Sequence, residues 1–183
     1  MAIRTIKTYE ELIWASIVAM LELDPNAPET QDKVRRSFPT DGQPGFLITD
    51  DITFMRVYSG GDPYDQNVYT DNSQVQSVTS YTRVITLALI AYGPSASENL
   101  ERIRVSFMAG NETLNLKAEN IFPVIKPSSV IRNPEYFEGK WWERADFSII
   151  MYALESTEIT IDGIESAEFE VIADDDERRI INV

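Results

Sequence analysis

The chain has neither cysteine nor histidine among its 183 residues. The absence of cysteine excludes disulfides, zinc–thiolate sites, iron–sulfur clusters and thiol nucleophiles. The absence of histidine removes the commonest general base and transition-metal ligand, and with them the Ser-His and Cys-His catalytic arrangements. A carboxylate pair, as in glycosidases, is the chemistry that remains, and the sequence singles out no such pair among its 30 acidic residues. We therefore expect no enzymatic activity, no cofactor and no metal.

Long hydrophobic runs are missing as well. The longest, residues 84–92, is interrupted by Thr86 and falls short of the roughly 18 to 20 residues that a bilayer span requires. The first residues, Met-Ala-Ile-Arg-Thr-Ile-Lys-Thr, contain no apolar segment followed by a small-residue cleavage site. The sequence therefore predicts neither a membrane protein nor secretion by a signal peptide, and we expect the chain to stay in the cytoplasm of the cell that makes it.

Positive charge is scarce. Sixteen basic residues face 30 acidic ones, for a net charge of −14. Tight binding to a phosphate backbone requires the opposite sign over the contact surface, so tight nucleic-acid binding is disfavoured. An acidic surface is instead compatible with a protein that DNA passes without adhering to it.

The length predicts one domain over residues 1–183, because a chain of this size buries most of its apolar surface around one core. Hydrophobic residues make up 43% and charged residues 25%, which are ordinary values for an ordered globular chain. Prolines and glycines mark residues 25–51 as a proline-rich insertion or loop. Residues 59–77 form a polar loop that is long for a compact domain, and we regard it as a candidate contact arm.

Two main helices are predicted, at residues 9–23 and 96–108. In both, apolar residues recur at the three- and four-residue spacing of one helical face. A short helix at 29–36 is also predicted. The capping boxes expected at the two main N-termini pair Thr8 with Glu11 and Ser95 with Glu98.

Strands are expected where β-branched and aromatic residues gather or alternate with polar ones. Residues 145–153 alternate most clearly, with Ala145, Phe147, Ile149 and Met151 on a drier face. The prolines in 122–131 favour an edge position for that strand. The other predicted strands are 52–58, 81–92, a weak extended piece at 113–116, and a hairpin pairing 158–161 with 167–172 around Asp162-Gly163. This order of elements predicts an α+β fold: a mixed, mainly antiparallel sheet with two main helices packed on it.

Three stretches, in this order, resemble the phage neck or tail terminator family, also called tail-completion proteins. They are the strand and loop from Ile52 to Asp62, the strand-to-helix passage Ala91-Tyr-Gly-Pro-Ser-Ala-Ser-Glu-Asn-Leu-Glu-Arg-Ile103, and Trp142-Glu-Arg-Ala-Asp-Phe-Ser-Ile149. The segment between Pro25 and Pro44 matches nothing in that family pattern.

The resemblance implies a structural virion protein, assembled in the host cytoplasm, whose copies form a homo-oligomeric ring of six. Such a ring would cap the head-proximal end of the tail tube, end tail polymerisation, and join the tube protein to the head–tail connector protein. Genome DNA would pass through it without specific binding. The alternative from another class is a monomeric or dimeric binding module, for instance an accessory domain of a baseplate, tail fibre or adhesin.

An aromatic cluster provides the first candidate contact residues, because aromatic side chains and arginine are favoured interface anchors. It consists of Tyr136, Phe137, Trp141 and Trp142, with Arg144 beside it. The alternative is that these rings fill the core of their own chain. Arg144 and Asp146, two residues apart, are expected to form a surface ion pair.

The long polar loop provides the second set of candidate contact residues, Asp62, Tyr64 and Asp65. Its aspartates, together with Asp71, could approach a hard cation. Their spacing departs from that of a calcium-binding EF-hand loop, so a solvated loop is the better interpretation.

Overall fold

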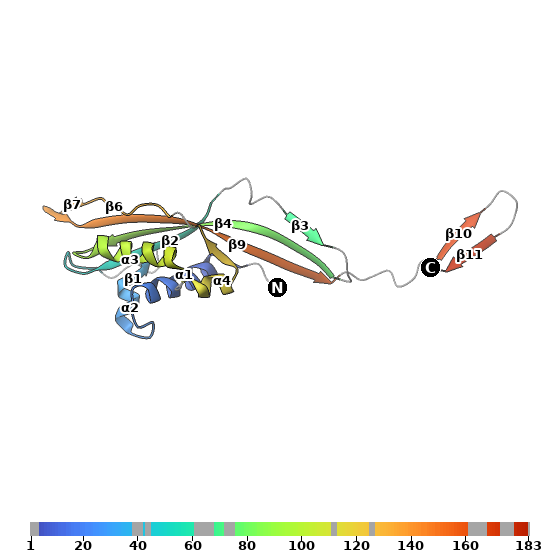
Figure 1. Cartoon of the computed structure of the whole chain (residues 1–183), viewed down its shortest axis with the longest axis horizontal. Coiled ribbons are helices and arrows are strands. Elements are labelled where there is room, and N and C mark those ends of the chain that lie inside the picture. Colours follow the sequence, from blue (N-terminus) through green and yellow to red (C-terminus); the bar gives the residue numbers. More distant parts are fainter. Residues whose placement is uncertain are drawn as a thin grey trace.

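The computed structural model describes residues 4–37, 42, 45–60, 68–71, 76–110, 113–124, 127–160, 168–172 and 178–182. Figure 1 shows the arrangement of the helices and strands along these residues. The helices are α1 (Ile6–Met20), α2 (Pro28–Lys33), α3 (Ala96–Ala109) and α4 (Leu114–Ala118). The strands are β1 (Val34–Arg36), β2 (Ile52–Ser59), β3 (Val68–Asp71), β4 (Gln76–Tyr92), β5 (Ile121–Pro123), β6 (Ile131–Arg132), β7 (Glu135–Phe137), β8 (Lys140–Trp142), β9 (Arg144–Thr160), β10 (Glu168–Ile172) and β11 (Arg178–Asn182).

A seven-stranded sheet forms the centre of the molecule. Its main path runs β1-β2-β4-β9-β5, with β3 also pairing with β4 and β6 also pairing with β9. β1 and β2 are parallel, and the other pairs in this sheet are antiparallel. Together with the two long helices α1 and α3, this confirms the predicted α+β fold with a mixed, mainly antiparallel sheet. None of the helices among the described residues is long and apolar enough to cross a bilayer.

β4 and β9 are the longest strands, at 17 residues each, and they pair along their whole length. The ladder runs from Tyr92 opposite Arg144 to Gln76 opposite Thr160. Both strands are longer than the predicted 81–92 and 145–153. Each is extended by a stretch rich in serine and threonine that has polar residues on both faces, so hydrophobic alternation gives no signal there.

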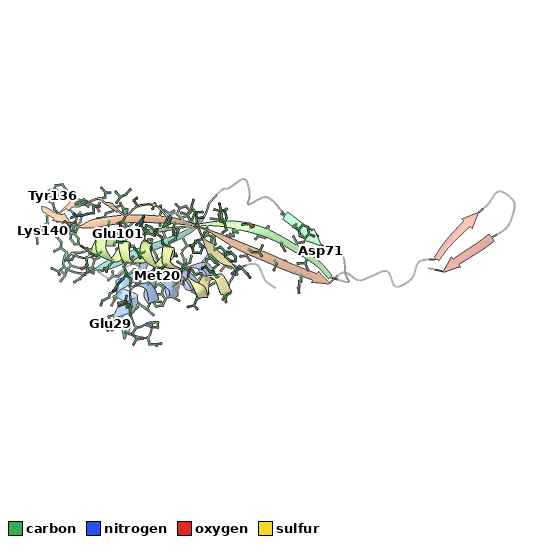
Figure 2. The ribbon with its side chains drawn as sticks, in the orientation of Figure 1. Met20, Glu29, Asp71, Glu101, Tyr136 and Lys140 are labelled. Atoms are coloured by element: carbon green, nitrogen blue, oxygen red, sulfur yellow. The ribbon has the colours of Figure 1, made fainter. Side chains whose placement is uncertain are left out.

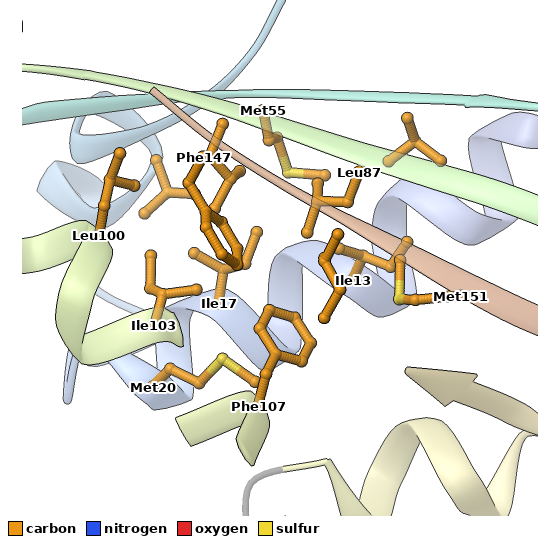
Figure 3. Close-up of a cluster of buried hydrophobic side chains, with 14 of the residues drawn as sticks. Ile13, Ile17, Met20, Met55, Leu87, Leu100, Ile103, Phe107, Phe147 and Met151 are labelled. Carbon is orange, nitrogen blue, oxygen red and sulfur yellow. The ribbon is translucent and has the colours of Figure 1, made fainter. Parts of the chain in front are cut away.

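The helices cover one face of the sheet, and the core lies between the two layers (Figures 1 and 3). The inward positions of β9 are buried, which confirms the drier face predicted for residues 145–153. Each large apolar side chain buried in this way stabilises the fold by about 1.5 to 3 kcal/mol relative to exposure. The largest contributors include Ile13 and Ile17 of α1, Leu100, Ile103 and Phe107 of α3, Leu87 of β4, and Phe147 and Met151 of β9.

The helix starts differ from the predicted capping boxes. α1 begins earlier, because the side chain of Thr5 accepts a hydrogen bond from the backbone N–H of Thr8 at 3.3 Å and acts as the N-cap. At α3 the Ser95 side chain makes no capping hydrogen bond. The backbone N–H of Ser95 instead donates to Asp51 Oδ1 at 2.7 Å. A carboxylate from a distant loop thus serves this helix start, and local spacing could not reveal it.

Three predicted elements change type or partner. Residues 113–116 are not extended, since Leu114–Ala118 is helical and the side chain of Leu116 is buried in the core. The short helix ends at Lys33, and β1 follows it within the segment expected to be a loop. The predicted C-terminal hairpin between 158–161 and 167–172 is also wrong, because residues 158–160 pair with β4 and β10 pairs with β11 instead. The expected turn at Asp162-Gly163 lies outside the described residues.

The strand predicted at 122–131 is two shorter strands, β5 and β6, and both pair with β9. β5 ends the main path of the sheet, which agrees with the edge position that the prolines predicted.

The passage from β4 into α3 depends on Gly93. Its φ is +108°, a value that residues with a side chain rarely adopt. An added Cβ would lie 2.4 Å from the backbone oxygen of Asp50 and 2.6 Å from Asp51 Oδ1. The loop before β2 therefore packs against the strand-to-helix turn so closely that only glycine fits.

We expect Gly93→Ala to lower the free energy of unfolding by roughly 3 kcal/mol, through backbone strain and the clash with Asp50 and Asp51. Urea denaturation measures the change. Gly45→Ala is the matched control, because nothing lies within 4 Å of the Cβ it would add. Equal stability of the two variants would contradict this account of the turn.

Candidate functional site: an aromatic hairpin and a projecting ribbon

Strands β7 and β8 form a small hairpin at one end of the long ladder. Tyr136 lies opposite Trp141, and Phe137 lies opposite Lys140. The two turn residues, Glu138 and Gly139, have φ values of +48° and +78°. Positive φ at both positions is typical of the type I′ turn, whose twist matches that of a two-residue hairpin.

Three aromatic side chains of this hairpin are exposed. The exposed fraction is 61% for Tyr136, 57% for Phe137 and 67% for Trp141. Tyr136 and Trp141 pack on each other, with ring centroids 5.2 Å apart. Their position at the tip of the sheet, where Tyr136 and Lys140 are labelled in Figure 2, leaves these rings uncovered. We call Tyr136, Phe137 and Trp141 the aromatic tip.

Trp142 has a different environment from that of its neighbour Trp141. It is half-buried, and its ring meets Phe46 edge-on at a centroid distance of 5.5 Å. Phe46 also contacts the rings of Phe54 and Tyr92, each at 5.7 Å. Trp142 therefore belongs to a cluster that supports the hairpin from the helix-free side of the sheet. From the sequence, each tryptophan could lie either at an interface or in the core. In the structure Trp141 is exposed, whereas Trp142 packs within its own chain.

Charged groups hold the base of the hairpin. Arg144 binds Asp146 Oδ1 through Nε at 2.9 Å, the ion pair that the spacing predicted, and reaches Glu135 Oε2 through Nη1 at 3.3 Å. Tyr92 donates its hydroxyl to the same Glu135 oxygen at 2.8 Å. Burial and this hydrogen bond raise the pKa of Tyr92, and although burial opposes it, hydrogen bonding to Asp146 raises the pKa of Arg144. Both groups therefore keep their protons at neutral pH, and the network is fixed.

The face of the sheet that carries no helices also exposes apolar side chains. Tyr58, Phe122, Ile150 and Leu154 are each between 40% and 46% exposed. Strand pairing places them on one face, since Tyr58 and Ile150 both lie opposite Thr86, and Phe122 lies opposite Tyr152. Exposed apolar patches of this kind mark interaction surfaces in soluble proteins.

At the other end of the ladder, β4 and β9 continue past the helices as a ribbon, with β3 added beside β4 (Figure 1). We define the projecting ribbon as β3 with residues 76–83 and 153–160. Serine and threonine dominate it, and Val68 and Tyr69 of β3 are exposed. Asp71 on the ribbon and Tyr136 on the aromatic tip lie at opposite ends of the β4–β9 ladder in Figure 2.

A buried carboxylate fastens the root of the ribbon to the helices. The Glu155 side chain is 4% exposed, binds Arg4 Nε at 3.1 Å, and accepts a hydrogen bond from the Tyr9 hydroxyl. Arg4 also donates to the backbone oxygen of Leu154 at 2.9 Å, and Arg83 donates to the backbone oxygen of Arg4 at 3.1 Å. Sequence analysis missed this site, because it joins three segments, residues 4–9, Arg83 and residues 154–155, that are each more than 70 residues apart, and only the fold brings them together.

The remaining predicted contact residues, Asp62, Tyr64 and Asp65, lie outside the described residues. Asp71 is the last residue of β3. Within the part of the chain that the structure describes, no group of three or more acidic side chains could hold a metal ion.

The comparisons with known proteins give one family match and no curated relative. The family model described as phage neck terminator protein matches residues 39–176, about three quarters of the chain. The match begins after α1, α2 and β1, although α1 provides part of the core. No curated protein matches the chain.

We expect Trp142→Ala to lower the free energy of unfolding by about 2 kcal/mol, because a half-buried ring leaves a void against Phe46. Trp141→Ala should change it by less than about 1 kcal/mol, the worth of one aromatic pair. Thermal unfolding of the isolated chain measures both. A larger loss for Trp141 than for Trp142 would show that the exposed ring, and not the half-buried one, holds the fold.

We expect Glu155→Ala to cost about 3 kcal/mol of unfolding free energy, because it leaves the Tyr9 hydroxyl and the Nε of Arg4 without their acceptor. The matched control is Glu158→Ala, three residues further along the same strand and exposed, with an expected change within about 0.5 kcal/mol. Urea denaturation of the two variants compares a buried with a solvated carboxylate on one strand.

Proposed function

The chain belongs to the phage neck terminator protein family, and from that premise we propose that its copies form a closed ring of six that caps the head-proximal end of the tail tube. As a family member it is a structural component of the phage neck, and thus of the virion. In the proposed role the ring ends tube polymerisation and then offers its other side to the head–tail connector. This task is mechanical and needs neither a reaction nor a cofactor.

The observation that carries the proposal is the aromatic tip. Three large rings lie uncovered on a hairpin whose base is fixed by the Arg144 network and by the packing of Trp142. Rigid aromatic side chains lose little conformational entropy when a partner covers them, and such residues are enriched among those that dominate binding energy. The aromatic tip is therefore suited to a stable contact with another virion protein.

The shape of the molecule supports a joining role. The aromatic tip and the projecting ribbon lie at the two ends of one continuous ladder (Figure 2). A subunit with contact surfaces at both ends of a rigid sheet can hold one partner at each end. The tube protein and the connector protein are the two partners that we propose.

The charge of the chain suits a ring through which DNA moves. Each copy carries a net charge of −14, and a ring concentrates that charge around one axis. Repulsion of phosphates keeps the affinity for DNA low, so the genome slides past without being retained.

We expect the purified chain, alone or with isolated tail tubes, to assemble into a species of about six times the 20.8 kDa of one chain. Native mass spectrometry and light scattering measure this mass, and electron microscopy shows whether tube ends are capped. Trp141→Ala should weaken binding to its partner at least about tenfold, as loss of an interface anchor does. The matched control is Val105→Ala, an exposed apolar residue of α3 away from the hairpin.

Phage that lack the protein should make tails of irregular length or tails without heads. Normal infectious particles from such a deletion would contradict the proposal. A chain that stays monomeric or dimeric and ignores tube ends would instead favour an accessory binding module.

A further inference from the structure

The projecting ribbon has an open edge on each side. Its three strands are ordered β3-β4-β9, so β3 forms one border and the distal part of β9 forms the other. Among the described residues, no strand pairs with the outer side of β3, and none pairs with β9 on the side away from β4 beyond Ala153. Exposed strand edges carry backbone groups that pair readily with another strand.

The outward-facing backbone groups of β9 follow from the bonds it makes closer to the core. The N–H of Leu154 donates to the backbone oxygen of Asn120 at 3.0 Å, and the backbone oxygen of Ile150 accepts from Val124 at 2.9 Å. The even-numbered residues of β9 thus point away from β4. Because this direction alternates along a strand, Ser156 and Glu158 direct their N–H and C=O groups to the open edge.

The same reasoning applies to β3. On β4, the backbone oxygen of Val84 accepts from the Gly60 N–H at 3.1 Å, so the even-numbered residues of β4 face away from β9. Tyr69 lies opposite Ser80, and the two exchange backbone bonds. Val68 and Thr70 therefore direct their backbone groups outward. The edge of β3 thus offers two such residues, spaced two apart, and the edge of β9 offers three, since Thr160 also has an even number.

The strand directions decide which edges can meet in a ring. β3 and β9 are each antiparallel to β4, so they run in the same direction as one another. Rotation about a ring axis that runs along the strands preserves this direction. β3 of one copy and β9 of the next then meet as parallel strands, which pair by evenly spaced hydrogen bonds.

We propose that the outer edge of β3 in one copy pairs in parallel with the distal edge of β9 in the next copy, so that the ribbons close into a continuous barrel around the ring axis. This inference rests on the proposed ring and names the surface that closes it. The occupant of each edge is a second copy of this chain. Only the edges of the ribbon are used in this pairing, so the end of the ribbon and the aromatic tip at the far end of the ladder both stay free for the tube and connector proteins.

Two features favour a second copy over a foreign strand. A foreign strand on one edge leaves the other edge open, whereas head-to-tail pairing of identical copies satisfies both edges at once and closes without ends. The ribbon also has serine and threonine on both faces and no helix layer of its own, so few apolar contacts stabilise it within one chain (Figure 1). Strand pairing with neighbours provides the stabilisation that the single chain lacks.

Paired cysteines test the junction, because the chain contains no cysteine of its own. Thr70 and Thr157 lie opposite Thr79 from the two neighbouring strands, so they share one face of the ribbon. Tyr69 and Ser156 are related in the same way and share the other face. Within one chain the members of each pair are separated by two strand spacings, about 9.6 Å, which exceeds the reach of a disulfide. The double variants T70C/T157C and Y69C/S156C can therefore form the designed bridge only between copies.

Each double variant is assembled as the full chain with tail tubes, oxidised with copper phenanthroline, and run on a non-reducing gel. We expect multimers linked beyond the dimer, about tenfold more abundant than in the single variants, since only a double variant continues the chain of bridges. A capped tube whose subunits do not link in either double variant would overturn the edge pairing while the proposed function stands. Absence of any assembly, measured by native mass and by uncapped tubes, would overturn the proposed function itself.

A single dimer band from S156C alone would indicate antiparallel pairing of β9 with its own copy about a twofold axis, and would also overturn the proposal. Proline gives an independent readout. Ser156→Pro removes an N–H that points outward, so it should abolish capping while the melting temperature of the isolated chain stays near that of the wild type. Its control, Thr157→Pro, removes an N–H that points to β4, and should lower the melting temperature as well.

Discussion

The pairing of β4 with β9 is the constraint on which the rest of the structure depends. One register, from Tyr92 opposite Arg144 to Gln76 opposite Thr160, sets both ends of the molecule. A slip of one residue would turn Leu87, Phe147 and their neighbours from the helices to solvent, so the hydrophobic layer fixes the register firmly. With that register fixed, the hairpin that follows Arg132 must emerge at one end, and the ribbon must project from the other.

Along this ladder the source of stability changes. Near the middle, apolar side chains from α1 and α3 cover the sheet, and burial holds the strands together. Glu155 marks the point where that cover ends, and there Arg4 and Tyr9 replace apolar packing with charge and hydrogen bonds. Beyond it, the ribbon has backbone pairing and many polar side chains, and no layer of helices covers it (Figure 1). A strand segment stabilised mainly by its backbone is well suited to accept further strands, because pairing is the interaction it has left to make.

The sequence predicted the parts of the fold in which local pattern and final environment agree. Alternation in residues 145–153 predicted a strand with one buried face, because along that whole length one face packs in the core and the other stays outside it. The extension to Thr160 gave no such signal, because neither of its faces meets a core. The site was half predictable for a similar reason. The cluster at 136–142 was identified by composition, but Trp142 is supported by Phe46, which is nearly a hundred residues earlier in the chain. The difference in burial between Trp142 and Trp141 therefore follows only from the folded sheet.

In the proposed ring, the arrangement separates two mechanical tasks that would otherwise compete. A contact that closes a ring must repeat identically around the axis, and backbone pairing at a strand edge does so with little dependence on side-chain shape. A contact with a different protein must discriminate, and exposed aromatic rings on a fixed hairpin provide shape and a large apolar area. Because one hydrogen-bonded ladder joins the two surfaces, an aromatic tip seated on its partner also fixes the tilt of the ribbon at the other end. Closure of the ring and attachment to the partner are then coupled through the sheet itself, without any change in its pairing.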